Sequence, residues 1–258
     1  MRFQVRFGEA QLTTPDPERP HGWLLSVDGV PQSYVDLDDP AYLRFEYMRY
    51  VGFVLDSLAP GPLETLHIGA GAFTLARRLA HLRAGSRQLA FELDAELVHV
   101  VWERLRVAEI PDLQVETCDG RLGVSRCGPG TFDLVVLDAW AGAVMPPALA
   151  TSEFFSDVAR VLRTGGCLVA NLAGGPELEF ARRVAATAGG AFPYVLLLAD
   201  SAVLTGRVFG HFVLVASPSP EPVSLVAGRV AGQGPSRLTC LYGDQLEIFG
   251  GQASPFQD

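Results

Sequence analysis

The pattern of hydrophobic and polar positions changes along this chain, from one typical of short β-strands to one of alternating strands and helices. Residues 1–7 alternate polar and apolar side chains, the period of half-buried β-strands, and short strands are expected over residues 1–35. Apolar stretches on both sides of Asp28-Gly29 predict a hairpin that turns at this pair. Asp39 can cap a helix and Pro40 suits its first turn, so a helix is expected from residue 40 to about residue 58. Residues 1–58 are therefore predicted to form an N-terminal β-hairpin lobe and a linking helix.

From residue 63 onward, strands and helices alternate. Strands are expected at 63–68, 88–93, 113–117, 132–137 and 167–171, with helices at 73–82, 95–107, 152–162 and 176–188. Two further strands, at 194–198 and 211–216, have no helix between them and should pair antiparallel at one edge of the sheet. The pattern predicts an α/β fold with a mostly parallel, seven-stranded sheet and helices on both faces.

The domain boundaries follow from the same pattern. A Rossmann-like nucleoside-binding domain is expected over residues 59–217. Residues 218–258 are rich in Pro, Gly and Ser and are expected to form a tail or a small appended lobe.

Composition narrows the classes of function. A chain of 258 residues that is 48% hydrophobic can bury the core of one large α/β domain. Its net charge of -9 argues against a nucleic-acid partner. The absence of lysine excludes Schiff-base enzymes and Walker-type phosphate loops.

Targeting and metal signals are not found either. The N-terminus has a strand pattern instead of a signal peptide, and no apolar run reaches the length of a membrane span. We therefore expect a cytoplasmic protein without a membrane partner. The four cysteines and five histidines match no metal-ligand spacing, so no metal is expected.

A glycine turn carries the first candidate chemistry. Gly69-Ala70-Gly71 follows a predicted strand and precedes a predicted helix, where glycine permits a sharp turn and the close approach of a ligand. A dinucleotide site would place a third glycine at position 74, and Thr74 stands there. The turn therefore favours a mononucleoside over NAD, with a purely structural βα turn as the alternative.

Three acidic residues stand at the ends of predicted strands. Glu92, followed by Leu93, comes 21 residues after Gly71, a spacing that suits an acceptor of both ribose hydroxyls. Asp119-Gly120 can accept a hydrogen bond from an adenine amino group or can form an ordinary turn. Asp138 ends a buried strand beside the first one and can orient or deprotonate an attacking amine.

Other side chains are weaker candidates for the same site. Gln32 and Tyr34 follow the hairpin turn and can cover the nucleoside from the N-terminal lobe. Trp140 can stack on a ring, although aromatic residues more often simply pack in the core. Glu46 can face the cavity, with solvent exposure as its alternative.

Together these stretches resemble the spermidine synthase family of aminopropyltransferases over about residues 22–217. The stretches are residues 27–33, 69–71, 91–94, 119–120, 132–138 and 210–217. The resemblance implies a class I methyltransferase-like Rossmann fold with an N-terminal β-lobe, and often a dimer. It implies decarboxylated S-adenosylmethionine as the donor and a polyamine as the acceptor. By position, Gln32, Glu92 and Asp119 would hold the nucleoside, and Asp138 would be the catalytic acid.

Two departures from the family pattern concern the cationic ends of its substrates. Ala72 stands where the family has the aspartate that helps to hold the donor's ammonium group, and Ala141 stands where it has a second acid after the catalytic one. Each lost ammonium contact removes about 1.5–3 kcal/mol. These losses leave two alternatives open, a methyltransferase that uses intact S-adenosylmethionine and a nucleoside-binding protein without catalysis.

Overall fold

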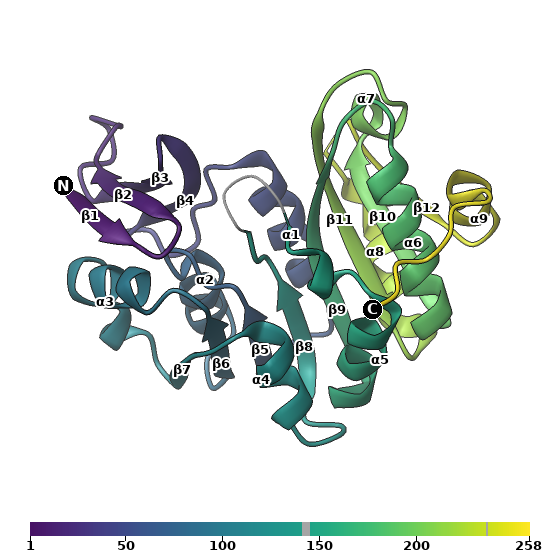
Figure 1. Cartoon of the computed structure of the whole chain (residues 1–258), viewed down its shortest axis with the longest axis horizontal. Helices are drawn as coiled ribbons and strands as arrows, with labels where there is room; N and C mark the ends of the chain where they lie inside the picture. Colours follow the sequence, from purple (N-terminus) through teal and green to yellow (C-terminus); the bar gives the residue numbers. More distant parts are fainter. Residues whose placement is uncertain (141–144, 236) are drawn as a thin grey trace.

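The computed structural model describes residues 1–140, 145–235 and 237–258. Figure 1 shows a small N-terminal sheet beside a larger sheet that is covered by helices on both faces. The small sheet has the order β1-β2-β3-β4 and is antiparallel throughout. Its strands are β1 (Arg2–Val5), β2 (Gly8–Thr13), β3 (Gly22–Val27) and β4 (Val30–Asp36).

The predicted hairpin is present as β3–β4. Val27 pairs with Val30, and the two turn residues Asp28 and Gly29 have φ values of 47° and 77°. A two-residue turn with two positive φ values matches the twist of the strands that it joins. The lobe is larger than a single hairpin, because β1 and β2 extend it.

The linking helix begins later than the sequence indicates. Helix α1 spans Glu46–Ser57, and Phe45 precedes it, so the predicted start at Asp39-Pro40 is wrong. The side chain of Asp36 accepts hydrogen bonds from the backbone N–H groups of residues 38 and 39 and pairs with Arg19. These bonds hold the segment as a loop at the end of β4, and Asp39 itself lies 3.5 Å from Arg19 instead of capping a helix.

The larger sheet has eight strands in the order β12-β10-β11-β9-β8-β5-β6-β7 within the described residues. Four neighbouring pairs, from β9 to β7, are parallel, and the remaining three are antiparallel. The strands are β5 (Glu64–Ile68), β6 (Arg87–Glu92), β7 (Leu113–Thr117), β8 (Phe132–Leu137), β9 (Leu162–Gly174), β10 (Tyr194–Asp200), β11 (Gly210–Ser217) and β12 (Leu238–Tyr242). The predicted α/β class with a mostly parallel sheet is confirmed, with eight strands in place of seven.

The additional strand comes from the C-terminal segment. Residues 218–258 form α8 (Pro220–Gln233), β12 and α9 (Asp244–Gly250), and β12 pairs antiparallel with β10. The predicted antiparallel pair β10–β11 is therefore present, but β12 and not this pair forms the edge. The division of the chain into units at residues 58 and 217 stays a prediction.

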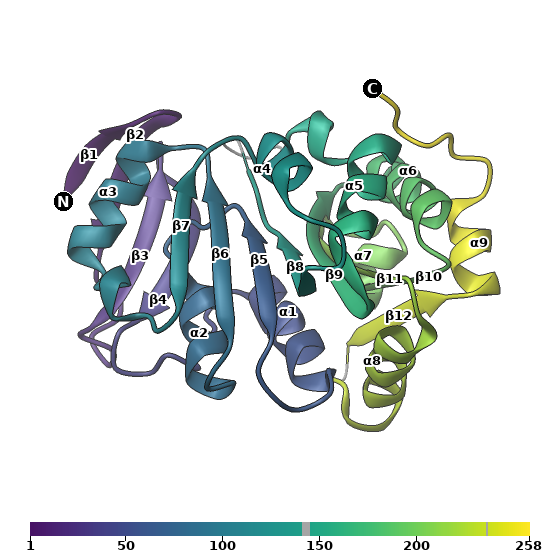
Figure 2. The ribbon, with the colours of Figure 1, turned by 90° about the horizontal axis from the view of Figure 1, so that it is seen from below.

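Two helical layers cover the sheet (Figures 1 and 2). On one face α1, α2 (Thr74–Leu82) and α8 pack on the sheet, and on the other face α4 (Gly120–Arg126), α5 (Ser152–Val161), α6 (Glu179–Ala191) and α9 do. Strand β8 alternates between the two cores, because Val135 and Leu137 face one helical layer while Leu134 and Val136 face the other. This two-sided burial explains its almost continuous apolar sequence.

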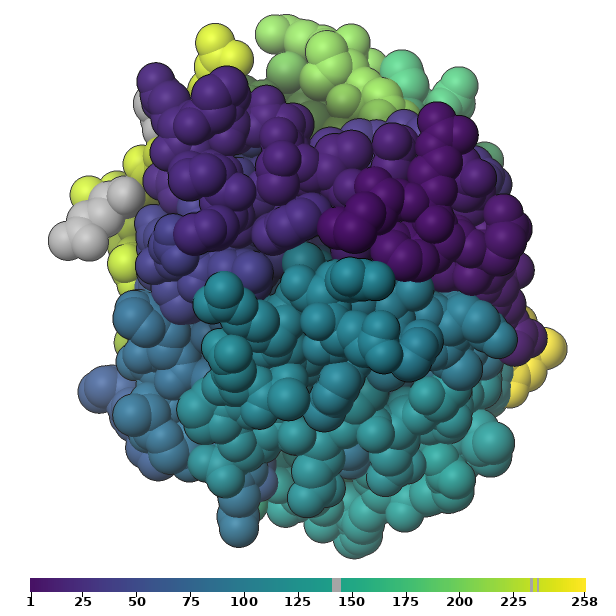
Figure 3. Space-filling model, turned by 90° about the vertical axis from the view of Figure 1, so that its left-hand side faces the viewer, coloured from purple at the N-terminus to yellow at the C-terminus, as the bar shows by residue number. Residues whose placement is uncertain are grey.

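The N-terminal sheet lies against α2 and α3 (Ala95–Arg104), and Figure 3 shows the two parts in contact along a long seam. Leu12, Leu25 and Val35 of the small sheet share one hydrophobic cluster with Val101 of α3. Asp94 ties the parts together, since it caps α3 and also accepts a hydrogen bond from the backbone N–H of Arg6 at 2.8 Å. Within the described part of the chain, no helix is both long and apolar enough to cross a bilayer.

Candidate active site

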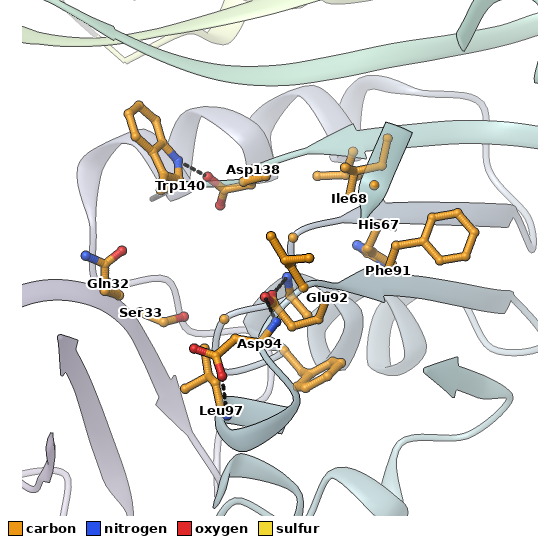
Figure 4. A pocket seen from close by; sticks show the side chains of 18 of the residues that line it. Gln32, Ser33, His67, Ile68, Phe91, Glu92, Asp94, Leu97, Asp138 and Trp140 are labelled. Atoms are coloured by element: carbon orange, nitrogen blue, oxygen red, sulfur yellow. Dashed lines mark hydrogen bonds between the residues drawn. The ribbon is translucent and has the colours of Figure 1, made fainter. Parts of the chain in front are cut away.

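The main pocket opens where the carboxyl ends of β5, β6 and β8 meet beneath the N-terminal sheet (Figure 4). The chain runs from β5 outward to β6 and β7 and then returns to β8 on the other side of β5, and open α/β sheets bind ligands at such a crossing. The pocket holds about 1390 Å³ of space, including its mouth to solvent. Ten of the expected site residues line it: Gln32, Gly69, Ala70, Gly71, Glu92, Leu93, Asp119, Gly120, Asp138 and Trp140.

The glycine turn is shaped by the chain that passes over it. Gly69 has a φ of 84°, and a Cβ at this position would collide with the backbone oxygen of Asp138. Gly71 also has a positive φ, of 52°. The backbone N–H of Asp138 donates to the carbonyl of Ile68 at 2.9 Å, which holds the two strand ends side by side. Glycine is thus needed here for close approach of the backbone as well as for the turn.

Glu92 faces the glycine turn from the end of β6. Its Oε2 accepts from the backbone N–H of Ala70 at 2.9 Å, and its Oε1 accepts from the N–H of Asp94 at 3.1 Å. Each carboxylate oxygen can accept a second hydrogen bond, so both remain able to bind a hydroxyl group. Asp94, and not Glu92, caps α3, as the sequence indicates.

Asp119 combines a structural position with a place in the pocket. Its side chain caps α4 by accepting from the backbone N–H of Leu122 at 3.0 Å. The residue is exposed and also lines the pocket together with Gly120. The two interpretations from the sequence, a turn and a binding residue, are therefore compatible.

Asp138 points into the pocket from the end of β8 (Figure 4). Its Oδ1 accepts two hydrogen bonds of 2.8 Å, one from Trp140 Nε1 and one from Asn171 Nδ2. Among the residues that the structure describes, no donor to Oδ2 is found. Burial raises the pKa of this carboxyl group, while the bonds from Asn171 and Trp140 and the nearby His211 act in the opposite direction.

Three further residues stand behind Asp138 and were not foreseen from the sequence. Asn171 of β9 is buried, and its Oδ1 lies 2.9 Å from Nδ1 of His211 in β11. The imidazole of His211 stacks on Tyr47 of α1 at 4.4 Å and meets the edge of Trp140 at 6.0 Å. The available signal was the position of Asn171 at the same sheet edge as Asp138, but the strand order was needed to use it.

A β-bulge separates the two expected residues of the N-terminal lobe. Ser26 pairs with Pro31 while Leu25 pairs with Ser33, so the register between β3 and β4 shifts at Gln32. A bulge re-aims its side chain, and Gln32 and Ser33 both line the pocket. In a regular strand Gln32 and Tyr34 would share one face.

The structure does not bring Tyr34 or Glu46 to the pocket. Tyr34 is buried inside the lobe, where its ring meets Tyr42 at 5.8 Å and the guanidinium of Arg44 lies 4.9 Å above it. Glu46 is exposed at the start of α1 and does not line the cavity. The expectation that these two side chains contact substrate in the pocket is therefore corrected for the described structure.

The structure describes only one of the two positions at which the sequence departs from the family pattern. Ala72 is fully buried in the cluster between the N-terminal sheet and α2, and it does not line the pocket. Ala141 lies outside the described residues.

The acidic side chains of the described pocket lining have no arginine or lysine beside them. Glu92, Asp94, Asp119 and Asp138 line the pocket, and no arginine does among the described residues. His67 is the one histidine of the described lining, and burial lowers its pKa to about 4, so it is neutral at physiological pH. The cavity therefore favours cations. Within the described residues, no group of three His, Cys, Asp or Glu side chains lies close enough to hold a metal ion.

The chain is similar in sequence to curated proteins that are named polyamine aminopropyltransferase. No family model matches the chain. A polyamine aminopropyltransferase from Vibrio vulnificus is 30% identical over 140 residues, which are 53% of this chain and 46% of the relative. Another from Chromobacterium violaceum is 30% identical over 142 residues, 54% of this chain and 53% of the relative. The chain thus spans about half the length of the curated relatives that it matches.

A solved structure extends the similarity to the full length. A probable spermidine synthase from Corynebacterium glutamicum superimposes with a TM-score of 0.87 and 29% identity, covering 100% of this chain and 96% of the other. The chain is therefore similar over its full length to a probable spermidine synthase.

More remote structures show the fold alone. A spermidine synthase in complex with the transition-state analogue AdoDATO has a TM-score of 0.65 and 16% identity, over 92% of this chain and 78% of its own. Human methyltransferase-like protein 13 in complex with SAH has a TM-score of 0.59 and 19% identity, over 71% and 90%. The chain therefore has the methyltransferase-like Rossmann fold expected from its sequence.

Proposed function

We propose that this protein is a transferase that moves the aminopropyl group of decarboxylated S-adenosylmethionine to an amine. The observation that carries the proposal is the charge of the pocket, whose four charged side chains among the described residues are all carboxylates. The curated relatives named polyamine aminopropyltransferase support the same chemistry.

The charge of the pocket favours the decarboxylated donor over the intact one. Decarboxylated S-adenosylmethionine carries a sulfonium and an ammonium group and no negative charge. Intact S-adenosylmethionine adds a carboxylate, which is costly to bury without a cationic or hydrogen-bonding partner. The described lining contains neither arginine nor a protonated histidine for it, and the chain has no lysine.

The nucleoside half of the donor fits the glycine turn and Glu92. The turn from Gly69 to Gly71 lines the pocket beside Glu92, and Glu92 has an acceptor site left on each oxygen. Asp119 and Gln32 also line the pocket. Asp119 is proposed to contact the adenine base, and Gln32 is proposed to cover the nucleoside from the N-terminal lobe. Leu93 adds an apolar surface beside Glu92.

Asp138 is proposed to act on the acceptor. Its Oδ2 accepts an N–H hydrogen bond from the neutral amine and directs the nitrogen lone pair at the methylene carbon beside the sulfonium. As the C–N bond forms, the C–S bond breaks and its electron pair returns to sulfur, which leaves as methylthioadenosine. The new secondary ammonium group then releases its proton to Asp138 or to water. Trp140 keeps the carboxylate oriented by donating to Oδ1.

A methyltransferase that uses intact S-adenosylmethionine is the second candidate. The fold it shares with human methyltransferase-like protein 13 and the replacement of the family aspartate by Ala72 favour it. The third possibility from the sequence is a nucleoside-binding protein without catalysis. The absence of product with either donor would support it.

Titration calorimetry with the two donors tests the proposal. We expect decarboxylated S-adenosylmethionine to bind more tightly than S-adenosylmethionine, and Asp138→Asn to reduce the difference in affinity between them. Tighter binding of intact S-adenosylmethionine would contradict the aminopropyl assignment and support methyl transfer.

The remaining expectations about partners rest on the resemblance and the composition. We propose a small-molecule amine as the acceptor, a homodimer as the assembly and the cytoplasm as the location. The net charge of -9 supports the expectation that nucleic acid is not a partner.

A further inference from the structure

We propose that His211 and Asn171 are positioning residues that hold Asp138 in the orientation needed for the transfer. The inference rests on the proposed function, since it assigns Asp138 its task. It adds two residues on two other strands, neither of which lines the pocket. We call the chain of hydrogen bonds from His211 through Asn171 to Asp138 the relay.

The sheet brings the three residues of the relay together. Strand β9 lies between β8 and β11, so Asn171 has Asp138 on one side and His211 on the other. Asn171 Nδ2 donates to Asp138 Oδ1 at 2.8 Å, and His211 Nδ1 lies 2.9 Å from Asn171 Oδ1. Because Asn171 is 1% exposed, it has no access to water to exchange these partners.

The direction of each hydrogen bond in the relay follows from the chemistry of its groups. An ionised carboxylate can only accept, so Asn171 must turn its NH₂ group toward Asp138. The carbonyl of Asn171 then faces His211 and can only accept, so Nδ1 of His211 must carry the proton. His211 thereby prevents Asn171 from rotating its carbonyl oxygen toward the carboxylate.

Packing holds His211 in place. Its ring stacks on Tyr47 at 4.4 Å with an interplanar angle of 18°, and Trp140 meets it edge-on at 6.0 Å. Trp140 also donates to Asp138 Oδ1 at 2.8 Å. Both donors therefore act on the same oxygen, and the carboxylate presents Oδ2 to the cavity.

The relay also affects the charge of Asp138. Burial favours its neutral form, and the bond from Asn171 favours the ionised form that accepts from an amine. The other titratable groups here are Tyr47 of α1, His211 of β11 and Glu46, which acts on His211. Burial raises the pKa of Tyr47 and lowers that of His211, so both stay neutral at physiological pH.

Loss of the Nδ1–H donor of His211 should shift the pH dependence of kcat/KM. If Asn171 rotates, an acceptor replaces a donor beside the carboxylate, and the pKa of Asp138 rises further. The ionised fraction then falls at a given pH, so the acidic limb of kcat/KM moves to higher pH. A purely structural role of His211 would not move this limb.

Two substitutions separate the hydrogen bond from the packing. His211→Phe keeps a ring on Tyr47 but removes the donor, while His211→Asn can place its amide nitrogen near the position of Nδ1. We expect His211→Phe to lower kcat about tenfold to a hundredfold, the loss for a hydrogen bond that supports a charge, and to leave donor affinity unchanged. We expect His211→Asn to retain most of kcat and the wild-type pH profile.

Turnover is followed by release of methylthioadenosine across pH, with thermal melting to show that the variants fold. Nitrogen-15 NMR of His211 provides a readout that does not need turnover. The relay requires protonated Nδ1 in the wild type and a shift toward the Nε2–H tautomer in Asn171→Leu.

Three outcomes would overturn the relay: an unchanged kcat and pH profile in His211→Phe, an equal loss in His211→Asn, or an Nε2–H tautomer in the wild type. If the wild type releases no methylthioadenosine with any amine, the proposed function fails, and the NMR result alone decides whether the relay exists.

Discussion

Glu92 and Asp138 share one pocket but stand in different surroundings. Glu92 accepts from two backbone N–H groups beside the glycine turn, where further hydrogen-bond acceptance is possible. Asp138 is half-buried at the end of β8, and burial raises the pKa of its carboxyl group. Two carboxylates in unlike environments are suited to unlike tasks, and the tasks proposed for them are binding of the donor by Glu92 and orientation of the acceptor by Asp138.

Replacing Glu92 by Gln tests the binding task. The amide keeps the size of the side chain but loses the charge and one acceptor oxygen. We expect decarboxylated S-adenosylmethionine to bind about ten- to a hundredfold more weakly by calorimetry, because a hydrogen bond to a charged group is lost. Glu96→Gln, on the exposed side of α3, is the matched control and should bind like the wild type. Equal affinities of the two variants would remove Glu92 from the site.

The placement of the glycine turn beside Glu92 could be predicted from the sequence because its determinants are local. A strand, a glycine turn and a helix place Gly69 and Gly71 together, and an acid about 20 residues later falls at the end of the next strand. Asn171 and His211 could not be predicted in the same way. Their meeting with Asp138 depends on which strands are neighbours, and that order is set by long-range pairing. Tyr34 was misplaced because the bulge at Gln32 breaks the alternation of β4.

At the scale of elements, the turn after β5 is shaped by its contact with the backbone at the end of β8. Gly69 is held between the end of β5 and the backbone of Asp138, so a side chain there would displace the end of β8. The sequence indicated the turn but not this second contact. The start of α1 was likewise missed, because the bonds of Asp36 to residues 38 and 39 favour a loop.

Alanine substitutions at two glycines separate the cost of a positive φ from the cost of a steric clash with the neighbouring backbone. Gly69 and Gly85 have φ values of 84° and 85°, but a Cβ at Gly85 would make only an ordinary contact of 3.7 Å with Pro62. We expect Gly85→Ala to lower the free energy of unfolding by about 1–2 kcal/mol, the cost of a positive φ. Gly69→Ala should cost several kcal/mol more and abolish donor binding. The measurements are urea unfolding and calorimetry, and equal losses of stability in the two variants would contradict this account of the turn.

At the scale of the whole molecule, the last residues of the chain tie three helices together. The backbone oxygen of Phe256 accepts from the N–H of Ser152 at 2.9 Å, at the start of α5, and its N–H donates to Thr187 of α6 at 2.9 Å. Asp258 forms an ion pair with Arg121 of α4. The sequence predicted a tail or a small lobe here and gave no sign of these contacts, because each partner lies more than 60 residues away.

Phe256→Ala tests how far this anchoring stabilises the fold. The ring is half-buried and packs against Phe180, with the guanidinium of Arg183 3.8 Å from its centre. We expect a loss of about 1–2 kcal/mol in the free energy of unfolding, in proportion to the partly buried apolar area. Hydrogen exchange should become faster at the start of α5. Gln257→Ala, an exposed neighbour, should change neither quantity. An effect of equal size in both variants would show that the ring does not anchor the segment.

The most direct test of the central claim is the product formed from each donor. The protein is mixed with decarboxylated S-adenosylmethionine or S-adenosylmethionine and a panel of amines, and the products are identified by mass spectrometry. We expect methylthioadenosine and an aminopropylated amine from the decarboxylated donor, with a rate that falls about a hundredfold or more in Asp138→Asn. Formation of S-adenosylhomocysteine and a methylated product instead, or methylthioadenosine release that does not depend on Asp138, would contradict the claim.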